Sequence, residues 1–256
     1  MKLASAIISA ALVYAVSGCA SIEQYKEDQE KNVRVAETHV QLGVGYLQQG
    51  NLEVALEKLQ KALDAKSDYA PAHSAIAVVY ERLLKFDEAD DHYREAIALD
   101  PEDGGAYNNY GVFLCNQGNA KEAEKYFLKA IETPRYPTPE LAYENAGACV
   151  RKIPDMKKSE EYLEQALKLN PRLPVALFNM AEIRFEQNNY LSSRGFLQRF
   201  EAVSPHNAES LWLGILVERK LGDKNAESNY AKQLQTKFPK SEQFKLLINS
   251  QGENQS

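Results

Sequence analysis

The sequence predicts an all-α fold, a solenoid of six helix-turn-helix repeats. Small residues recur with a period of 34, interrupted by one step of 36. Two other series, one of alanine or serine and one of turn residues, keep the same period and phase. The composition agrees, because only 10 prolines and 13 glycines interrupt 256 residues, and this favours long helices. A fixed period of this length is the signature of units that stack on one another.

Each repeat is predicted to hold two helices, A and B, that cross closely. Helix A has a small residue midway along it, in the series Gly43, Ala77, Gly111, Gly147 and Ala181. Helix B has two series of small residues, which allow it to pack against its own helix A and against that of the next repeat. These two series are Ala55, Ala89, Ala123, Ser159 and Ser193, and then Ala62, Ala96, Ala130 and Ala166.

Turn residues and prolines set the predicted boundaries. The turns between helices A and B are Gly50-Asn51, Leu84-Lys85, Gly118-Asn119, Pro154-Asp155, Asn188-Asn189 and Gly222-Asp223. The repeats then run over 36–69, 70–103, 104–137, 140–173, 174–207 and 208–240. Ala226 lies one residue early, so the second helix of repeat six is expected to be offset. A further helical stretch over 242–248 is expected to bury Phe244, Leu247 and Ile248.

The period, and the prolines that end helix B at Pro101, Pro171, Pro205 and Pro239, resemble the tetratricopeptide repeat. The resemblance implies a right-handed superhelical solenoid over 36–249, with a C-terminal capping helix and a disordered tail over 250–256. It also implies that the second, fifth, ninth and twelfth residues of helix A line a concave face. In repeats one to three these positions include a predicted apolar floor for a protein partner, formed by Val40, Val44, Leu47, Val78 and Val112.

Two alternatives for this face stay open. In the first, an N-terminal helix of the chain itself covers the floor, and in the second, an error in the phase of the repeats means that these side chains are covered by other residues. Asn108 and Asn109 are candidates for the same groove, or one of them hydrogen-bonds a neighbouring loop. Chaperone-binding tetratricopeptide proteins hold a peptide carboxylate with basic residues at these positions, and repeats one to three lack them, which speaks against a carboxylate clamp.

The first residues predict an export signal and a lipid attachment site. Lys2 supplies a positive end, and Leu3 to Val16 is apolar apart from two serines. That run fits a secretory signal and is shorter than the roughly 20 residues that span a bilayer. The following residues, VSGC ending at Cys19, resemble a bacterial lipobox, which implies a signal peptide over 1–18 and acylation of Cys19. An ordinary signal peptide with a chance cysteine is the alternative.

The residues after Cys19 indicate where the chain is delivered. Alanine at position 20 implies the outer membrane, because in bacterial lipoproteins an aspartate there usually causes retention in the inner membrane. A charged segment over 23–31 is interpreted as a tether or a frayed helix. The lipidated N-terminus and tether are therefore assigned to residues 19–35.

Charge and motifs argue against several functions. The net charge of -6 speaks against binding to nucleic acid or to an anionic membrane surface. No P-loop, G-x-S-x-G or G-x-G-x-x-G motif occurs, and the four histidines lie at no metal-ligand spacing. The sequence therefore predicts no enzyme, cofactor, metal site or small-molecule substrate. His39 and His73, which hold the same position of repeats one and two, are interpreted as packing residues near the start of helix A.

Cys115 and Cys149 form either a disulfide or two buried free thiols. They lie near the same level on the successive A helices of repeats three and four, and the periplasm is oxidising. A bond requires Cα atoms within about 7 Å of each other, which the sequence alone does not establish.

Several stretches are more specific than the repeat. They are Val40–Leu52, Asn108–Cys115, Tyr143–Cys149 and Glu209–Ile215. Together with the lipobox they resemble the PilF/PilW family of type IV pilus biogenesis lipoproteins. The resemblance implies a pilotin on the periplasmic face of the outer membrane. A pilotin binds secretin (PilQ-like) subunits and promotes their outer-membrane localisation and their assembly into the ring through which the pilus passes.

Two other functions stay open. An adaptor lipoprotein for barrel assembly or for cell-wall hydrolases would share the lipobox and the repeats. A lipid-anchored enzyme would need a carboxylate pair in the groove, which the repeat phase does not provide. Loss of twitching motility on deletion would favour the pilotin over both.

Overall fold

The computed structural model describes residues 3–134, 136–153 and 155–252, with side chains described from residue 23 to residue 250 within these ranges. These residues form thirteen α-helices and no strand. The chain divides into two compact units, Met1–Glu102 and Asp103–Ser256, and each is described by itself. The predicted all-α repeat fold is confirmed. No helix among the described residues has the length and apolar character that a membrane span requires.

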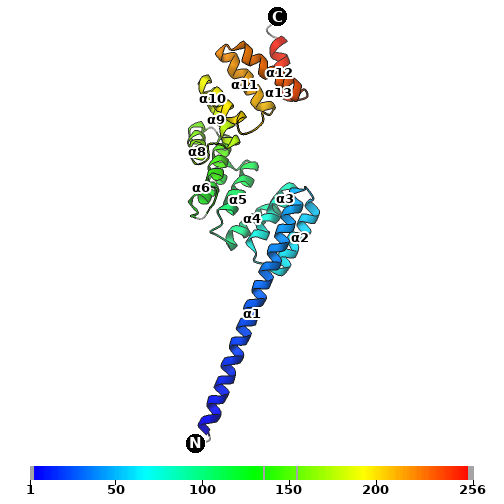
Figure 1. Cartoon of the computed structure of the whole chain (residues 1–256), viewed down its shortest axis with the longest axis vertical. Helices are drawn as coiled ribbons and strands as arrows, with labels where there is room; N and C mark the ends of the chain where they lie inside the picture. The colour runs from blue at the N-terminus through cyan, green and yellow to red at the C-terminus, as the bar shows by residue number, and fades with distance from the viewer. Residues whose placement is uncertain (1–2, 135, 154, 253–256) are drawn as a thin grey trace. The chain divides into compact units, whose positions relative to one another are not determined.

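The first unit consists of two helical pairs, in which the first helix is much longer than its partners (Figure 1). Its helices are α1 (Leu3–Gln48), α2 (Leu52–Ala65), α3 (Ala70–Arg82) and α4 (Phe86–Leu99). Because α1 is continuous, the segment 19–35 is helical and no break marks the predicted start of the repeats at residue 36. The predicted lipidation concerns the side chain of Cys19, which lies outside the described part of the structure.

The second unit continues the helical pairs and ends in a single helix. Its helices are α5 (Gly104–Asn116), α6 (Ala120–Glu132), α7 (Pro139–Val150), α8 (Met156–Leu169), α9 (Pro174–Glu186), α10 (Tyr190–Glu201), α11 (Ala208–Leu221), α12 (Lys224–Lys237) and α13 (Glu242–Gly252). The expected offset in repeat six is wrong, because α12 begins at Lys224, one full period after Tyr190 begins α10. The side chain of Asp223 caps α12, and this cap sets the start of the helix rather than Ala226.

A left-handed residue ends helix A in five of the pairs. Gly50, Gly118 and Gly222 have φ between 77 and 82°, and Leu84 and Asn188 have φ of 60 and 59°. In each case the N–H of the next residue donates to the carbonyl five residues earlier, at 2.8 to 3.1 Å. This closure satisfies carbonyls that the helix end would leave unpaired, and glycine adopts it without a Cβ clash. The periodic turn residues therefore determine where the helices end.

Small residues lie where helices A and B cross. Ala77 of α3 and Ala181 of α9 are fully buried. In α7 the position is Gly147, where an added Cβ would stand 2.6 Å from Cγ of Leu163 in α8. The close approach of the two helices therefore leaves no room for a methyl group in this repeat.

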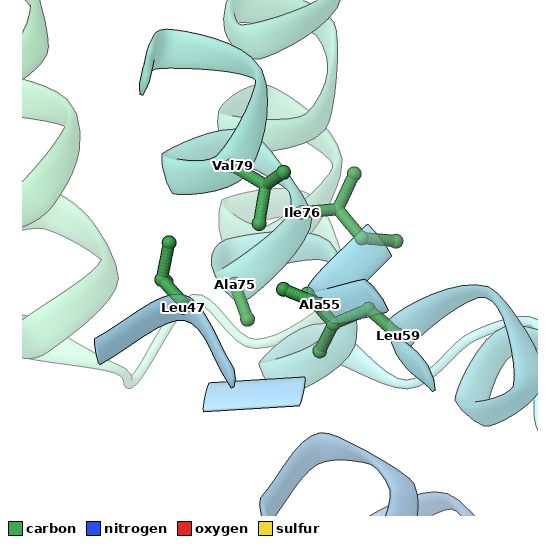
Figure 2. Close-up of a cluster of buried hydrophobic side chains, with 6 residues drawn as sticks. All are labelled: Leu47, Ala55, Leu59, Ala75, Ile76 and Val79. Atoms are coloured by element: carbon green, nitrogen blue, oxygen red, sulfur yellow. The ribbon is translucent and has the colours of Figure 1, made fainter. Parts of the chain in front are cut away.

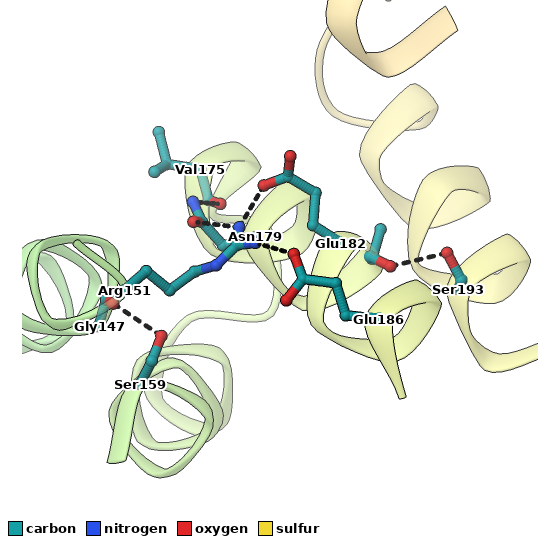
Figure 3. Close-up of polar contacts among 9 residues, drawn as sticks. Gly147, Arg151, Ser159, Val175, Asn179, Glu182, Glu186 and Ser193 are labelled. Atoms are coloured by element: carbon teal, nitrogen blue, oxygen red, sulfur yellow. Dashed lines mark hydrogen bonds and ion pairs between the residues drawn. The ribbon is translucent and has the colours of Figure 1, made fainter. Parts of the chain in front are cut away.

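Serine replaces alanine in two of the B helices without leaving a buried hydroxyl unpaired. Ser159 Oγ donates to the carbonyl of Gly147, and Ser193 Oγ donates to the carbonyl of Ala181, each at 2.7 Å (Figure 3). Both serines are fully buried. Each hydroxyl therefore ties helix B to helix A of its own repeat, which offsets the cost of burying a polar group.

Replacing Gly147 by alanine is expected to lower the free energy of unfolding by about 1 to 3 kcal/mol, because Leu163 must shift to make room. The matched control is Gly195→Ala in α10, where an added Cβ meets nothing within 4 Å. That change should raise stability by roughly 0.5 to 1 kcal/mol, because alanine is the better helix former. Urea denaturation followed by circular dichroism measures both. Equal destabilisation by the two variants would contradict the close crossing.

The C-terminal capping helix is longer than expected and buries fewer side chains. Leu247 is buried and Phe244 is half-buried against the cluster that contains Leu211 and Ile215. The expectation for Ile248 is wrong, because its side chain is 53% exposed. It lies next to Leu247 along the helix, so it points about 100° away from the buried face. The predicted disordered tail over 250–256 starts too early, because α13 continues to Gly252, and residues 253–256 lie outside the described residues.

Candidate functional site

The first unit places three of the predicted floor valines together. Val40 and Val44 of α1 and Val78 of α3 are half-buried, and all three pack against one hydrophobic cluster. Their inner sides are held by the core while part of each side chain stays accessible. These three residues, called the valine floor below, are the part of the predicted apolar site that the first unit supports.

Leu47 does not belong to this surface, and its assignment to the floor is wrong. Its side chain is only 7% exposed and lies inside the cluster formed with Ala55, Leu59, Ala75, Ile76 and Val79 (Figure 2). The carbonyl of Leu47 also accepts a hydrogen bond from the Arg82 guanidinium at 2.9 Å. Because α3 packs against the end of α1, the twelfth position of helix A is buried in this repeat.

Asn108, in the second unit, is also not free to bind a partner. It is 9% exposed, and its Oδ1 accepts a hydrogen bond from Asn145 Nδ2 at 3.0 Å. This bond joins α5 to α7. The sequence left open that one of the two asparagines hydrogen-bonds a neighbouring loop. Asn108 does form such an internal hydrogen bond, but its partner lies on a helix.

Val112 is half-buried and lines a hollow of about 140 Å³ between α5, α6 and α7. Cys115 and Cys149 line the same hollow and are joined by a disulfide, with their Cα atoms 5.9 Å apart. Lys152 Nζ donates to the carbonyl of Cys115 at 3.3 Å. The second unit therefore has its own small recess, with an apolar wall, at the level of the disulfide.

Farther along the second unit, two of the predicted concave positions, Arg151 and Glu182, are charged and pair with each other. Arg151, the C-cap residue that follows α7, forms ion pairs with Glu182 and Glu186 of α9, and also donates to Asn179 Oδ1 at 3.3 Å (Figure 3). The Arg151 side chain is only 20% exposed. These groups hold α7 against α9, so this part of the face is stabilised by internal pairs.

Glu144, at the fifth position of helix A in repeat four, is directed to the groove by the repeat phase but lies inside the protein. It is 7% exposed, and its Oε1 accepts the backbone N–H of Ala176 at 2.7 Å. Burial raises the pKa of this carboxyl, and the N–H groups of Ala176 and Val175 oppose that shift. The side chain thus satisfies N–H groups of the first turn of α9, a place where negative charge is favoured.

The first unit contains a contact between two histidines that are too far apart in sequence to match a metal-ligand motif. His73 Nδ1 and His92 Nδ1 are 3.0 Å apart, and His73 Nε2 lies 3.1 Å from the carbonyl of Ser67. Since a carbonyl only accepts, His73 has its proton on Nε2, and His92 donates to His73 when both rings are neutral. Burial, together with the neighbouring His73, lowers the pKa of His92. The pair therefore joins α3 to α4 as packing residues.

Among the described side chains, no group of three or more histidine, cysteine, aspartate or glutamate residues is arranged to hold a metal ion. Two accessible apolar surfaces lie at the predicted concave positions: the valine floor of the first unit and the recess beside the disulfide in the second.

Comparison with known proteins shows the same repeat and a specific set of relatives. Residues 34–102, 74–138 and 142–173 each match the tetratricopeptide-repeat family. The chain is 34% identical over 208 residues to the type IV pilus assembly protein PilF of Pseudomonas aeruginosa. That match covers 81% of this chain and 82% of PilF. Human protein O-mannosyl-transferase TMTC2 is 29% identical over 74% of this chain, but only 28% of TMTC2 is covered.

Solved structures agree. The structure of Pseudomonas aeruginosa PilF matches with a TM-score of 0.80 at 32% identity, over 86% of this chain and 99% of that one. The structure of PilW, described as a widely conserved type IV pilus biogenesis factor, matches with a TM-score of 0.76 at 29% identity. It covers 84% of this chain and 98% of PilW.

Proposed function

Because the chain belongs to the PilF and PilW family of tetratricopeptide-repeat proteins of type IV pilus biogenesis, we propose that it acts there as a pilotin. In this proposal acylated Cys19 anchors it to the periplasmic face of the outer membrane. The repeats bind PilQ-like secretin subunits and promote their localisation and multimerisation, and no catalytic step is involved. The membership supports the pilus process, and the lipobox sequence supports the anchor.

The observation that supports a secretin-binding role best is the valine floor. Val40, Val44 and Val78 come from two helices, and the core behind them fixes their positions. A partner strand or amphipathic helix could bury apolar side chains against them, as in strand addition or helix-in-groove recognition. A rigid apolar contact of this kind loses little side-chain freedom on binding, which favours affinity.

The test is the variant Val44→Glu/Val78→Glu, expressed from the native locus. Each carboxylate would have to be desolvated at the centre of the contact, so secretin binding should weaken by several kcal/mol. Secretin multimers on a gel, and twitching motility with them, should fall. The control is Val175→Glu on α9, a valine that is 47% exposed in the other unit, which should leave multimers at the normal level.

Two further measurements separate the parts of the proposal. Helical circular dichroism of the purified double variant must be retained, because both valines also touch the core. Normal multimers in a stably folded double variant would move the site to the aromatic residues of repeats five and six, Phe178, Phe185 and Trp212. The lipid anchor is tested separately. The variant Cys19→Ser should give a folded protein that is lost from the outer-membrane fraction and not labelled with palmitate. Retained label would overturn the anchor.

A further inference from the structure

In the later repeats, helix A is buried on two faces. One face meets helix B of the same repeat. The second face packs on the preceding repeat and, in each helix A, contains two buried positions that are four residues apart. In α3 these are Ala72 and Ile76, and the equivalents in α7 and α9 are Ala142, Ala146, Ala176 and Met180. Each of these six side chains is at most 1% exposed.

The equivalent positions of α1 are open, because no helical pair among the described residues packs on them. Thr38 and Leu42 stand one period before Ala72 and Ile76, and Leu42 is 46% exposed. Val35 is 38% exposed, and a Cβ added at Gly45 would meet nothing within 4 Å. At about 100° per residue, Val35, Thr38, Leu42 and Gly45 share one side of α1, opposite the valine floor. They are called the α1 stacking face below.

The internal repeat shows what covers such a face. Leu56 and Leu63 of α2, seven residues apart, pack against the cluster that contains Ile76 of α3. Leu63 also packs against the cluster that contains Ala72. An amphipathic helix with large aliphatic residues at this spacing is therefore the element that closes the stacking face wherever the chain itself supplies one.

Two basic side chains lie next to the α1 stacking face, within reach of carboxylates on a bound helix. Beside Val35 and Thr38 lies a hollow of about 310 Å³, also lined by Lys31, Arg34 and His39. The side chains of Lys31 and Arg34 are both exposed, and Arg34 also forms an ion pair with Glu30 of the same helix at 3.7 Å. The buried Nδ1 of His39 has no hydrogen-bond partner among the described residues. Carboxylates on a bound helix would complement the two basic side chains.

We propose that the α1 stacking face binds an amphipathic helix of another protein, which packs on α1 as α2 packs on α3. The partner helix has two large aliphatic residues seven positions apart and carboxylates that meet Lys31 and Arg34. The chain cannot supply this helix from the residues just before the face, because Leu3–Gln48 is one continuous helix. The contact is separate from the valine floor, so the protein could hold two partners at once.

The repeat itself supplies the probe. A fluorescein-labelled peptide with the sequence of residues 51–66, held helical by a staple between the exposed positions 60 and 64, is titrated with the full chain in detergent. Fluorescence anisotropy should show saturable binding, and Leu42→Glu should weaken it at least tenfold. A peptide with serine in place of Leu56 and Leu63 should not bind. The control Leu191→Glu alters a leucine that is 69% exposed on α10 and should leave binding unchanged.

Three outcomes would overturn the proposal. Binding that does not saturate, or that is equal for Leu42→Glu, would show that the face does not accept a helix. A dimer in analytical ultracentrifugation that is lost in Leu42→Glu would assign the face to a second copy of this chain. Loss of secretin multimers in Val44→Glu/Val78→Glu tests the valine floor alone, so failure of either idea leaves the other standing.

Discussion

Replacing Arg194 by methionine is expected to lower the free energy of unfolding by about 3 kcal/mol at neutral pH, because it leaves Glu218 buried without its partner. Glu218 of α11 is 3% exposed, and Arg194 of α10 donates to it through both Nε, at 2.9 Å, and a second guanidinium nitrogen. The hydrogen bond that Arg194 donates to Glu218 raises the pKa of Arg194 further, so its guanidinium stays charged. Asp223, at 3.6 Å from the guanidinium, is more exposed and adds less.

The double variant Arg194→Met/Glu218→Leu separates the value of the pair from the cost of an orphaned charge. Replacing both partners by apolar residues of similar size should restore most of the stability, because the desolvation of two charges then disappears as well. The deficit of the single variant should also shrink as the pH falls, since a buried unpaired carboxylate has a raised pKa and becomes neutral. Urea denaturation at pH 7 and pH 5 measures both effects.

A loss in the single variant that the double variant does not restore would mean that the aliphatic part of Arg194 contributes packing instead. An exposed pair provides a reference for the method. Lys61→Met breaks the pair with Glu57 on α2, where both side chains are about half exposed, and should leave the urea midpoint unchanged.

The helix boundaries could be predicted from the sequence because one local device recurs. A left-handed residue and a bond to the carbonyl five residues earlier end helix A, and this depends on residues close in sequence, such as Gly50 and Gly118. Even Leu84, a residue type that the left-handed conformation disfavours, ends its helix one repeat period after Gly50. A position fixed by its neighbours in sequence can therefore be assigned from periodicity alone.

Burial at the edge of the concave face could not be assigned in this way. Counting along helix A places Leu47 and Asn108 in the groove, yet each is buried because of residues in the next repeat. Ile76 and Val79 enclose Leu47, and Asn145 engages Asn108. The repeat phase predicts the direction in which a side chain leaves its own helix. Whether that side chain is buried depends on the size and polarity of the residues of the next repeat that lie opposite it.

The histidine pair is signalled by the repeat rather than by metal-ligand spacing. The positions of His73 and His92 hold tyrosine pairs in repeats three and four. Tyr107 and Tyr126 have ring centroids 6.3 Å apart, and Tyr143 and Tyr162 6.4 Å, against 5.0 Å for the histidines. Aromatic residues that recur at these two positions lie side by side on antiparallel helices, so a comparison between repeats would have found the contact.

The disulfide between Cys115 and Cys149 is expected to contribute about 3 to 4 kcal/mol to the stability of the second unit, the loss that Cys115→Ala/Cys149→Ala should show. The two cysteines have a sequence separation of 34 and join α5 to α7 across α6, so the bond restricts a long loop in the unfolded chain. Both side chains are buried. Alanine is chosen because serine would add a polar group there.

Thiol counts and reductant distinguish this bond from two free thiols. In a Cys19→Ser background, the denatured and unreduced protein should show no free thiol, and reduction should reveal two. Dithiothreitol should lower the urea midpoint of the parent by as much as the double substitution does, while the double variant should not respond. Because the bond also lines the recess beside Val112, its loss should disturb that surface first, and hydrogen exchange in α5 and α7 should rise more than in α1. Two thiols in the unreduced protein, or a midpoint insensitive to dithiothreitol, would show that packing alone holds these helices together.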